Sequence, residues 1–243
     1  MIVLIAAAMT AAAPAAVPPA VTAPAVTGPA VTAPAPAACP DLVTTKAFIC
    51  RALEAQKAGD SAAAATAFEQ AAQAGPEKDP ATARMWAASG NLWIAAGQPG
   101  KAAIALDKAL ALPGLEAEQH GEALLDRARA AEAQNDLKTA RAKLTEAAAS
   151  ISADPFYWYF SAALFVREGD APGARMAIGR ALTLAPSDPT ILFEAGHVMH
   201  FAGDDVKARE YWTRAASSDA DSPAGKAARD ALNLLPVPIT VKQ

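Results

Sequence analysis

Large apolar, small apolar and polar residues recur along most of the chain at intervals of 34 or 38 residues. At each interval a glycine or asparagine is followed at once by Asp or Gln, at 59–60, 97–98, 135–136, 169–170 and 203–204. Glycine and asparagine tolerate the left-handed backbone at a helix end, and Asp or Gln can accept hydrogen bonds from the free N–H groups of the next helix. The pattern therefore predicts five pairs of helices.

Each of these signals can be placed at position 15 of a 34-residue frame, which gives the units 45–78, 83–116, 121–154, 155–188 and 189–222. Positions 20 and 27 are alanine in all five units, and position 8 is always alanine or glycine. Positions 4 and 24 are always large and apolar. Small residues let two helices approach closely and large ones fill the space beside them, so we predict one packing for all five units.

Two four-residue insertions, 79–82 and 117–120, separate the first three units and should extend a helix or a turn. After the fifth unit, 223–235 places alanines and leucines on one helical face and polar residues opposite. This predicts a capping helix, which a repeat stack needs at its open end. Pro236 ends it and leaves 236–243 as a tail.

The frame resembles the tetratricopeptide repeat (TPR), with its W-x2-L-G-x2-Y…A-x3-F…A…P pattern, over about three quarters of the chain. Departures occur at position 11, which is not aromatic throughout, and at position 32, which is proline only at Pro76 and Pro186. The resemblance implies an all-α fold, a right-handed superhelix of helix pairs with a C-terminal capping helix. We expect this domain to span 41–235.

Composition supports helices and excludes several classes of protein. Hydrophobic residues make up 53% of the chain, but 68 of them are alanine, the best helix former. An all-β fold is excluded, and so is a multi-spanning membrane protein, because no run of about 18 large apolar residues occurs. The net charge is -4 and no Lys/Arg cluster occurs, which argues against nucleic acid as a partner.

The first 40 residues carry no charged side chain and contain 8 of the 19 prolines. The apolar run 1–9 and the small residues after it are typical of a secretory signal peptide, although no Lys or Arg precedes it, and we predict such a segment at 1–16. A five-residue repeat, Pro-Ala-Val-Thr followed by Ala or Gly, then predicts a disordered spacer at 17–40, with a reach of about 60 to 80 Å. The expected location is the bacterial periplasm. The alternatives are the cytoplasm and a tether through an uncleaved N-terminus.

Cys39 and Cys50 are the only cysteines. An even number of cysteines in an exported protein favours a disulfide. A helix starting at Asp41 would hold the two about 16 Å apart and prevent the bond, whereas a start near Thr44 would let the preceding residues fold back and allow it. The sequence leaves open whether the pair is bonded or forms two free thiols.

No catalytic or cofactor motif emerges from the sequence. Residues 97–101 are faintly similar to a phosphate loop but lack its first glycine and its Ser or Thr. His197 and His200 lie three apart on one predicted helix face, within reach of one metal ion, but a third ligand is missing. We therefore predict no enzyme, no cofactor and no metal site. The alternative is a histidine-based carrier of a metal or small ligand built on the last two units.

The resemblance implies a concave groove lined by positions 2, 5, 9, 12 and 13 of the first helix in each unit. The carboxylate-clamp version of the family needs Lys and Asn at positions 5 and 9 of its first unit, where this chain has Ile49 and Leu53. Recognition of an acidic C-terminal peptide is therefore not expected. The remaining groove positions combine an aromatic half with scattered arginines. The candidate peptide-binding residues are Arg84, Asn91, Arg129, Phe156, Tyr159, Arg167, Phe193, His197, His200 and Phe201.

Exposed aromatic residues in a concave surface favour peptide binding. The alternative is that Phe156, Tyr159 and Phe193 pack against the neighbouring unit. Together with the resemblance, these residues predict a non-catalytic scaffold or adaptor that binds a protein or peptide segment in the bacterial cell envelope. We expect no nucleic-acid partner and, after removal of the signal segment, no integral membrane association.

Overall fold

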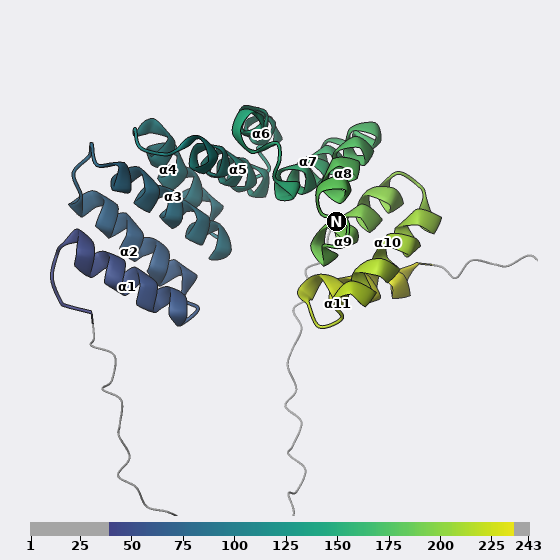
Figure 1. The fold of residues 1–243 in the computed structure, drawn as a ribbon, viewed down its shortest axis with the longest axis horizontal. Helices are drawn as coiled ribbons and strands as arrows, with labels where there is room; N and C mark the ends of the chain where they lie inside the picture. Colours follow the sequence, from purple (N-terminus) through teal and green to yellow (C-terminus); the bar gives the residue numbers. More distant parts are fainter. Residues whose placement is uncertain (1–38, 236–243) are drawn as a thin grey trace, which may run out of the picture. The chain divides into compact units, whose positions relative to one another are not determined.

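The computed structural model describes residues 39–235, which belong to one of the two units into which the chain divides. The predicted signal segment 1–16, residues 17–38 of the predicted spacer and the tail 236–243 lie outside the described residues. Helices are the only regular secondary structure in the described part (Figure 1). They are α1 (Thr45–Lys57), α2 (Ser61–Ala74), α3 (Pro80–Ala95), α4 (Pro99–Ala111), α5 (Ala117–Ala133), α6 (Leu137–Ile151), α7 (Pro155–Glu168), α8 (Ala171–Leu184), α9 (Pro189–Phe201), α10 (Asp205–Ser218) and α11 (Pro223–Leu234).

Each helix packs against the next one along the chain, so that α1 to α10 form five consecutive pairs and α11 follows as a single helix (Figure 1). The first helices of neighbouring pairs also contact one another, α3 with α5, α5 with α7, and α7 with α9. Contacts restricted to near neighbours are characteristic of a repeat stack. The predicted all-α fold of stacked helix pairs is confirmed.

The helix boundaries follow the predicted stop and start residues. The stop residues all have positive φ angles, the conformation that glycine and asparagine tolerate best: Gly59, Gly97, Asn135, Gly169 and Gly203. Four of the five start residues cap the next helix, because their carboxylates accept a hydrogen bond from the backbone N–H three residues on: Asp60, Asp136, Asp170 and Asp204. Gln98 makes no such bond, and Pro99 follows it at the first helical position. Local chemistry therefore fixes where each pair turns.

The two insertions lengthen the first helices of units two and three. α3 has 16 residues and α5 has 17, whereas α1, α7 and α9 have 13 or 14. Both extra turns lie at the N-terminal end, where Pro80 and Ala117 begin the helices ahead of the 34-residue frame. The expectation that the insertions extend a helix without breaking the stack is confirmed.

Alanine fills the tightest contacts between the two helices of a unit. The alanines at positions 20 and 27 are all fully buried: Ala64, Ala71, Ala102, Ala109, Ala140, Ala147, Ala174, Ala181, Ala208 and Ala215. At position 8 the approach is closer still, because a Cβ added to Gly90 would overlap Leu106 and one added to Gly196 would overlap Trp212. Leu106 and Trp212 both occupy position 24, so the predicted match between small and large positions is confirmed.

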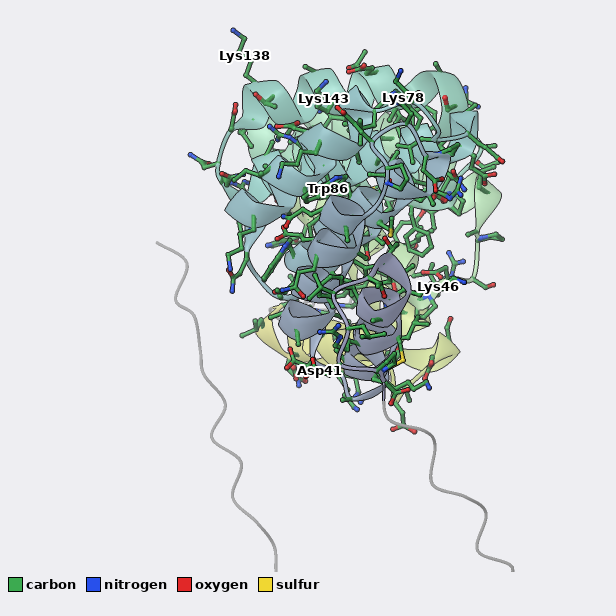
Figure 2. The ribbon with its side chains drawn as sticks, turned by 90° about the vertical axis from the view of Figure 1, so that its left-hand side faces the viewer. Asp41, Lys46, Lys78, Trp86, Lys138 and Lys143 are labelled. Atoms are coloured by element: carbon green, nitrogen blue, oxygen red, sulfur yellow. A yellow bond between two sulfur atoms is a disulfide. The ribbon has the colours of Figure 1, made fainter. Side chains whose placement is uncertain are left out.

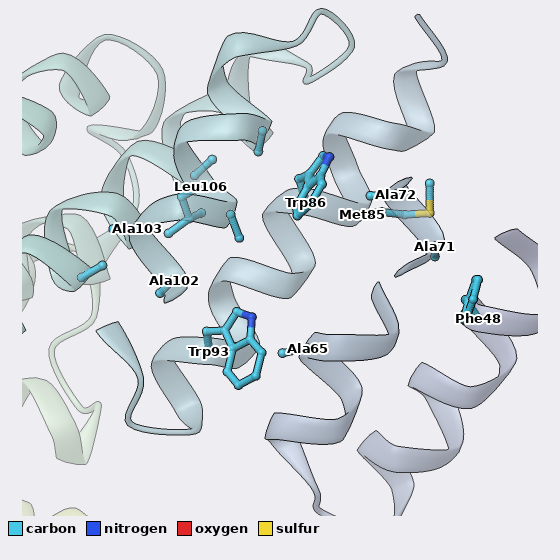
Figure 3. Packing of buried hydrophobic residues seen from close by; sticks show 14 residues of the cluster. Phe48, Ala65, Ala71, Ala72, Met85, Trp86, Trp93, Ala102, Ala103 and Leu106 are labelled. Carbon is cyan, nitrogen blue, oxygen red and sulfur yellow. The ribbon is translucent and has the colours of Figure 1, made fainter. Parts of the chain in front are cut away.

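The buried core is divided along the stack. The first cluster joins α1 to α5 and includes Phe48, Trp86, Trp93 and Leu106 (Figure 3). The following clusters centre on α5 to α7, on α7 to α9 and on α9 to α11. Each unit therefore shares its core with the next, and α11 covers the last unit.

A disulfide joins Cys39 to Cys50, with the two Cα atoms 5.7 Å apart. The bond is sterically available because α1 begins at Thr45, with the Thr44 hydroxyl accepting from the Ala47 N–H. The chain before Thr44 is not helical and folds back along α1, where its Leu42 carbonyl accepts a hydrogen bond from the Arg51 guanidinium. This is the second of the two geometries that the sequence left open.

Most charged side chains lie on the outside of the stack, as Lys138 of α6 illustrates, whereas Trp86 lies among the helices (Figure 2). Glu194 is a buried exception. In the described part of the chain, no helix is both long enough and apolar enough to cross a membrane. The large apolar residues are instead distributed over the inter-helix clusters.

Candidate peptide-binding surface

The ten candidate residues lie on α3, α5, α7 and α9, the first helices of units two to five, each of which contacts the next. We call these ten residues the A-helix surface. Its polar part consists of Arg84, Asn91, Arg129 and Arg167. Its aromatic part consists of Phe156, Tyr159, Phe193, His197, His200 and Phe201.

Asp126 connects the polar side chains of α3 and α5. Its Oδ2 accepts a hydrogen bond of 2.8 Å from Asn91 Nδ2, and its Oδ1 lies 2.8 Å from Arg129 Nη1. The sequence analysis missed Asp126, which occupies position 6 of its unit and not one of the groove positions. Its spacing of three residues from Arg129 on one helix was the signal available for it.

Arg84 lies at a hollow of about 300 Å³ between α3 and α5. Asn91, Glu122 and Asp126 also line this hollow, and its apolar lining comes from Ala87, Ala88, Leu115 and Ala123. Within residues 39–235 the Arg84 guanidinium has no ion pair and no side-chain hydrogen bond. It is therefore the candidate arginine that remains available to a ligand.

Carboxylates accumulate beside this hollow. Burial, above all, and then the charges of Glu118, Asp126 and Asp154 raise the pKa of Glu122 above its ordinary value. Glu118, Glu122 and Asp154 also line an adjoining hollow of about 400 Å³ between α5 and the turn that follows α6. The surface of α5 is thus more acidic than the groove positions alone suggest.

Arg167 is already engaged by protein groups. It forms an ion pair with Glu132 at the end of α5 and donates a second hydrogen bond of 3.0 Å to Asn135 Oδ1. Arg129 is likewise paired with Asp126. The Arg167 pair joins α7 to α5, the Arg129 pair lies within α5, and the charges of both arginines are largely compensated.

The aromatic part combines exposed and half-buried rings. Phe156 is 47% exposed and Phe201 is 40% exposed, although both are large and apolar. Tyr159 meets the ring of Phe156 edge to face, with centroids 6.2 Å apart. Tyr159 and Phe193 are half-buried against the clusters that join α7 to α9 and α9 to α11. Phe156 and Phe201 are thus exposed, as peptide binding requires, whereas Tyr159 and Phe193 also pack against neighbouring helices.

Tyr159 lies between α5 and α9. Burial raises the pKa of its hydroxyl above the ordinary value, the Glu194 carboxylate raises it further, and Arg129 of α5 opposes both. Groups from both neighbouring helices therefore act on one side chain of α7. The polar and aromatic parts meet at this residue.

His197 and His200 surround Trp212 of α10. The His197 ring centroid is 4.3 Å from that of Phe193 and 5.6 Å from that of Trp212, and the His200 centroid is 5.9 Å from that of Trp212. His200 Nδ1 lies 2.6 Å from Asp205 Oδ1, whereas His197 Nδ1 lies 3.6 Å from Glu194 Oε2.

The two histidines therefore approach different carboxylates. Across the described residues, no group of three or more His, Cys, Asp and Glu side chains could hold a metal ion. No contact of either ring favours the histidine-based carrier over a surface that binds a protein segment.

The fold and this surface define an α-helical repeat protein. A family model described as tetratricopeptide repeat matches residues 51–117 and 125–189, and the chain belongs to this family. TPR proteins generally mediate protein–protein interactions, and the TPR scaffold is typically non-catalytic. No curated protein matches the chain in sequence.

Solved TPR structures share the superhelical fold. The chain is similar to PilW, a widely conserved type IV pilus biogenesis factor (TM-score 0.63, 19% identity, 75% of this chain and 81% of PilW covered). It is also similar to MamA (TM-score 0.56, 18% identity, 80% and 98% covered) and to YrrB, a TPR protein with an unusual peptide-binding site (TM-score 0.53, 17% identity, 76% and 91% covered). At these identities the likeness establishes the fold alone.

Proposed function

We propose that the protein is a non-catalytic TPR scaffold that binds an extended segment of a partner protein along the A-helix surface, in the bacterial cell envelope. The observation that carries the proposal is the pair of exposed rings, Phe156 and Phe201, beside the half-buried Tyr159 and Phe193. Aromatic rings that a fold leaves partly uncovered supply large contact area at low entropic cost when a partner covers them.

Two further features support this function and location. YrrB, which has a similar fold, carries a peptide-binding site, although an unusual one. The Cys39–Cys50 disulfide supports an oxidising compartment, because disulfides persist outside the reducing cytoplasm. The signal-like run at the start of the sequence points the same way.

The binding proposal is tested by replacing the two exposed rings. The double variant Phe156→Ala/Phe201→Ala should capture about tenfold less partner protein, or less still, from an envelope extract. Its thermal midpoint should stay within a few degrees of the wild type, because exposed rings contribute little to the stability of the fold. The matched control is Ile104→Ala/Val206→Ala, which removes two exposed apolar side chains from the second helices α4 and α10. Equal capture by the two double variants would contradict the proposal.

The envelope location is tested separately by fractionating cells that express the full chain. Mass spectrometry of the protein in the periplasmic fraction should give a mature N-terminus within the first 40 residues, close to residue 16. A full-length chain that fractionates with the cytoplasm would overturn this part of the proposal and leave the binding surface untouched.

A further inference from the structure

Glu194 of α9 is a carboxylate that the protein itself leaves without a hydrogen-bond donor. Only 9% of the residue is exposed. The basic group that approaches it is the His197 imidazole, whose Nδ1 lies 3.6 Å from Oε2, beyond hydrogen-bond distance. Within residues 39–235 no backbone or side-chain group donates a hydrogen bond to either oxygen.

Other buried or half-buried polar side chains of the first helices differ: Ser89 Oγ of α3 has no hydrogen-bond partner, whereas Asp126 and Thr82 do. Asp126 accepts bonds from Asn91 and Arg129, and the buried Thr82 hydroxyl donates to the Pro76 carbonyl at 2.8 Å. A carboxylate offers about four acceptor sites, and burying it without donors costs several times more than burying a neutral group. Neither Glu194 oxygen is among the fully buried atoms without a partner, so both keep contact with solvent and have acceptor capacity that a ligand can use.

The His197 ring approaches Glu194, and two further aromatic rings lie near it. Phe193 and His197 lie on the same helix with their rings 4.3 Å apart, and Tyr159 of α7 is close enough for the Glu194 charge to act on its hydroxyl. A carboxylate flanked by aromatic rings is suited to a basic side chain, because the ring faces attract the cation and the oxygens accept its N–H groups.

The charges nearby favour the same ligand. Arg129 and Arg167 are already paired with Asp126 and Glu132, so neither neutralises Glu194. On α5, which packs against α7, Glu118 and Glu122 have no cationic partner within the described residues. A positively charged group that enters this part of the A-helix surface is therefore attracted and meets no uncompensated cation there.

We propose that Glu194 receives an arginine side chain of the bound segment, with the rings of Tyr159, Phe193 and His197 against the guanidinium and its aliphatic stem. The proposal rests on the proposed function, since it names the chemistry of the segment bound at that surface. Arginine is expected over lysine, because its planar group pairs with a carboxylate through two N–H groups and stacks on rings. The partner is thus a segment that carries arginine next to apolar or aromatic residues.

The test begins with a displayed library of random twelve-residue peptides selected on the full-length protein. Selected peptides should carry arginine beside apolar residues. One selected peptide is then synthesised with arginine and with citrulline, which has the same shape without the charge. The citrulline peptide should bind the wild type about tenfold or more weakly, and both peptides should bind Glu194→Gln with the same reduced affinity.

The control variant is Glu210→Gln, which changes an exposed carboxylate on α10 of the same unit and should keep the full preference for arginine. If Glu194→Gln does not fold, the comparison of arginine and citrulline on the wild type decides alone, and equal affinities overturn the inference. Selected peptides that need Phe156 and Phe201 but carry no basic residue also overturn it and leave the proposed function standing. Selection that yields no peptide dependent on those two rings overturns both.

Discussion

At the scale of single residues, the closest contacts of the stack depend on glycine at position 8. Gly90 and Gly196 lie where a single added carbon would overlap Leu106 and Trp212. At Gly196 the consequence extends to the binding surface, because the Trp212 indole that covers it also contacts His197 and His200 and donates a hydrogen bond of 3.0 Å to the Phe193 carbonyl. The Trp212 side chain therefore contributes both to the packing of the core and to the positions of the aromatic residues on the A-helix surface.

Gly196→Ala should lower the free energy of unfolding by about 2 kcal/mol or more, because the methyl group forces Trp212 out of its position. Gly179→Ala provides the matched control, since Gly179 lies on an exposed part of α8 with no atom within 4 Å of an added Cβ. That change should stabilise the protein by about 0.5 to 1 kcal/mol through the lower entropy of the unfolded chain. Urea unfolding measures both, and a neutral or stabilising Gly196→Ala would contradict the packing described.

At the scale of helices, each boundary is set by residues adjacent in sequence, which is why the five pairs could be predicted from the sequence. Asn135 and Asp136 act as a stop and a cap through their own backbone angle and a hydrogen bond to a residue three positions on. The disulfide was open to two outcomes because it depended on whether α1 began at Asp41 or a few residues later. Boundaries of helices are uncertain at that level when only sequence is used.

The binding surface was less predictable, because it depends on contacts between helices. Family groove positions located the exposed Phe156 and Phe201, but they gave no sign that Arg129 and Arg167 are paired across or along the helices. Asp126 and Glu194 share position 6, which is not a groove position, so the family pattern did not mark either of them, although Asp126 lies three residues from Arg129. Whether such a carboxylate finds a donor is decided by the neighbouring helix, which periodicity does not describe.

The cap of α10 gives a prediction about pH. The Lys207 N–H, 3.1 Å from Asp204 Oδ1, is the main cause that lowers the pKa of Asp204 below its ordinary value. Because the pKa of this carboxyl is lower in the folded protein than in the unfolded chain, the ionised carboxylate stabilises the fold above the unfolded pKa, about 4. This stabilisation is lost as the pH falls through the pKa of the folded protein. Asp204→Ala should therefore lower the thermal midpoint at pH 7.

The difference in midpoint between Asp204→Ala and the wild type should shrink between pH 7 and pH 2, because the wild-type carboxyl becomes protonated as the pH falls through its lowered pKa. Asp230→Ala, which removes an exposed carboxylate within α11, should show no loss at either pH. A difference for Asp204→Ala that is the same at both pH values would mean that the carboxylate charge is not what stabilises the start of α10.

At the scale of the whole stack, the core is a series of clusters that each join neighbouring units, so the two ends need different protection. At the first end the Cys39–Cys50 bond holds the chain against α1. At the last end, Ala228 of α11 and Leu235, which follows the helix, cover Leu192 and Trp212. In a stack with nearest-neighbour contacts, loss of the disulfide or of α11 should first destabilise the helices at the same end of the stack.

Truncation after Ser222 removes α11 and should speed amide hydrogen exchange in α9 and α10, where the last cluster loses its cover, while α1 to α3 keep their protection. Because α9 carries Phe193, His197 and Phe201, binding at the aromatic part should weaken in the same variant. The reciprocal variant, Cys39→Ser/Cys50→Ser, loses roughly 3 kcal/mol of loop constraint and should speed exchange in α1 while leaving α9 and its binding intact. Hydrogen exchange measured by mass spectrometry distinguishes these outcomes. A uniform loss of protection along the chain in either variant would contradict the prediction, because it would show that the stack unfolds as a single cooperative unit and not from its ends.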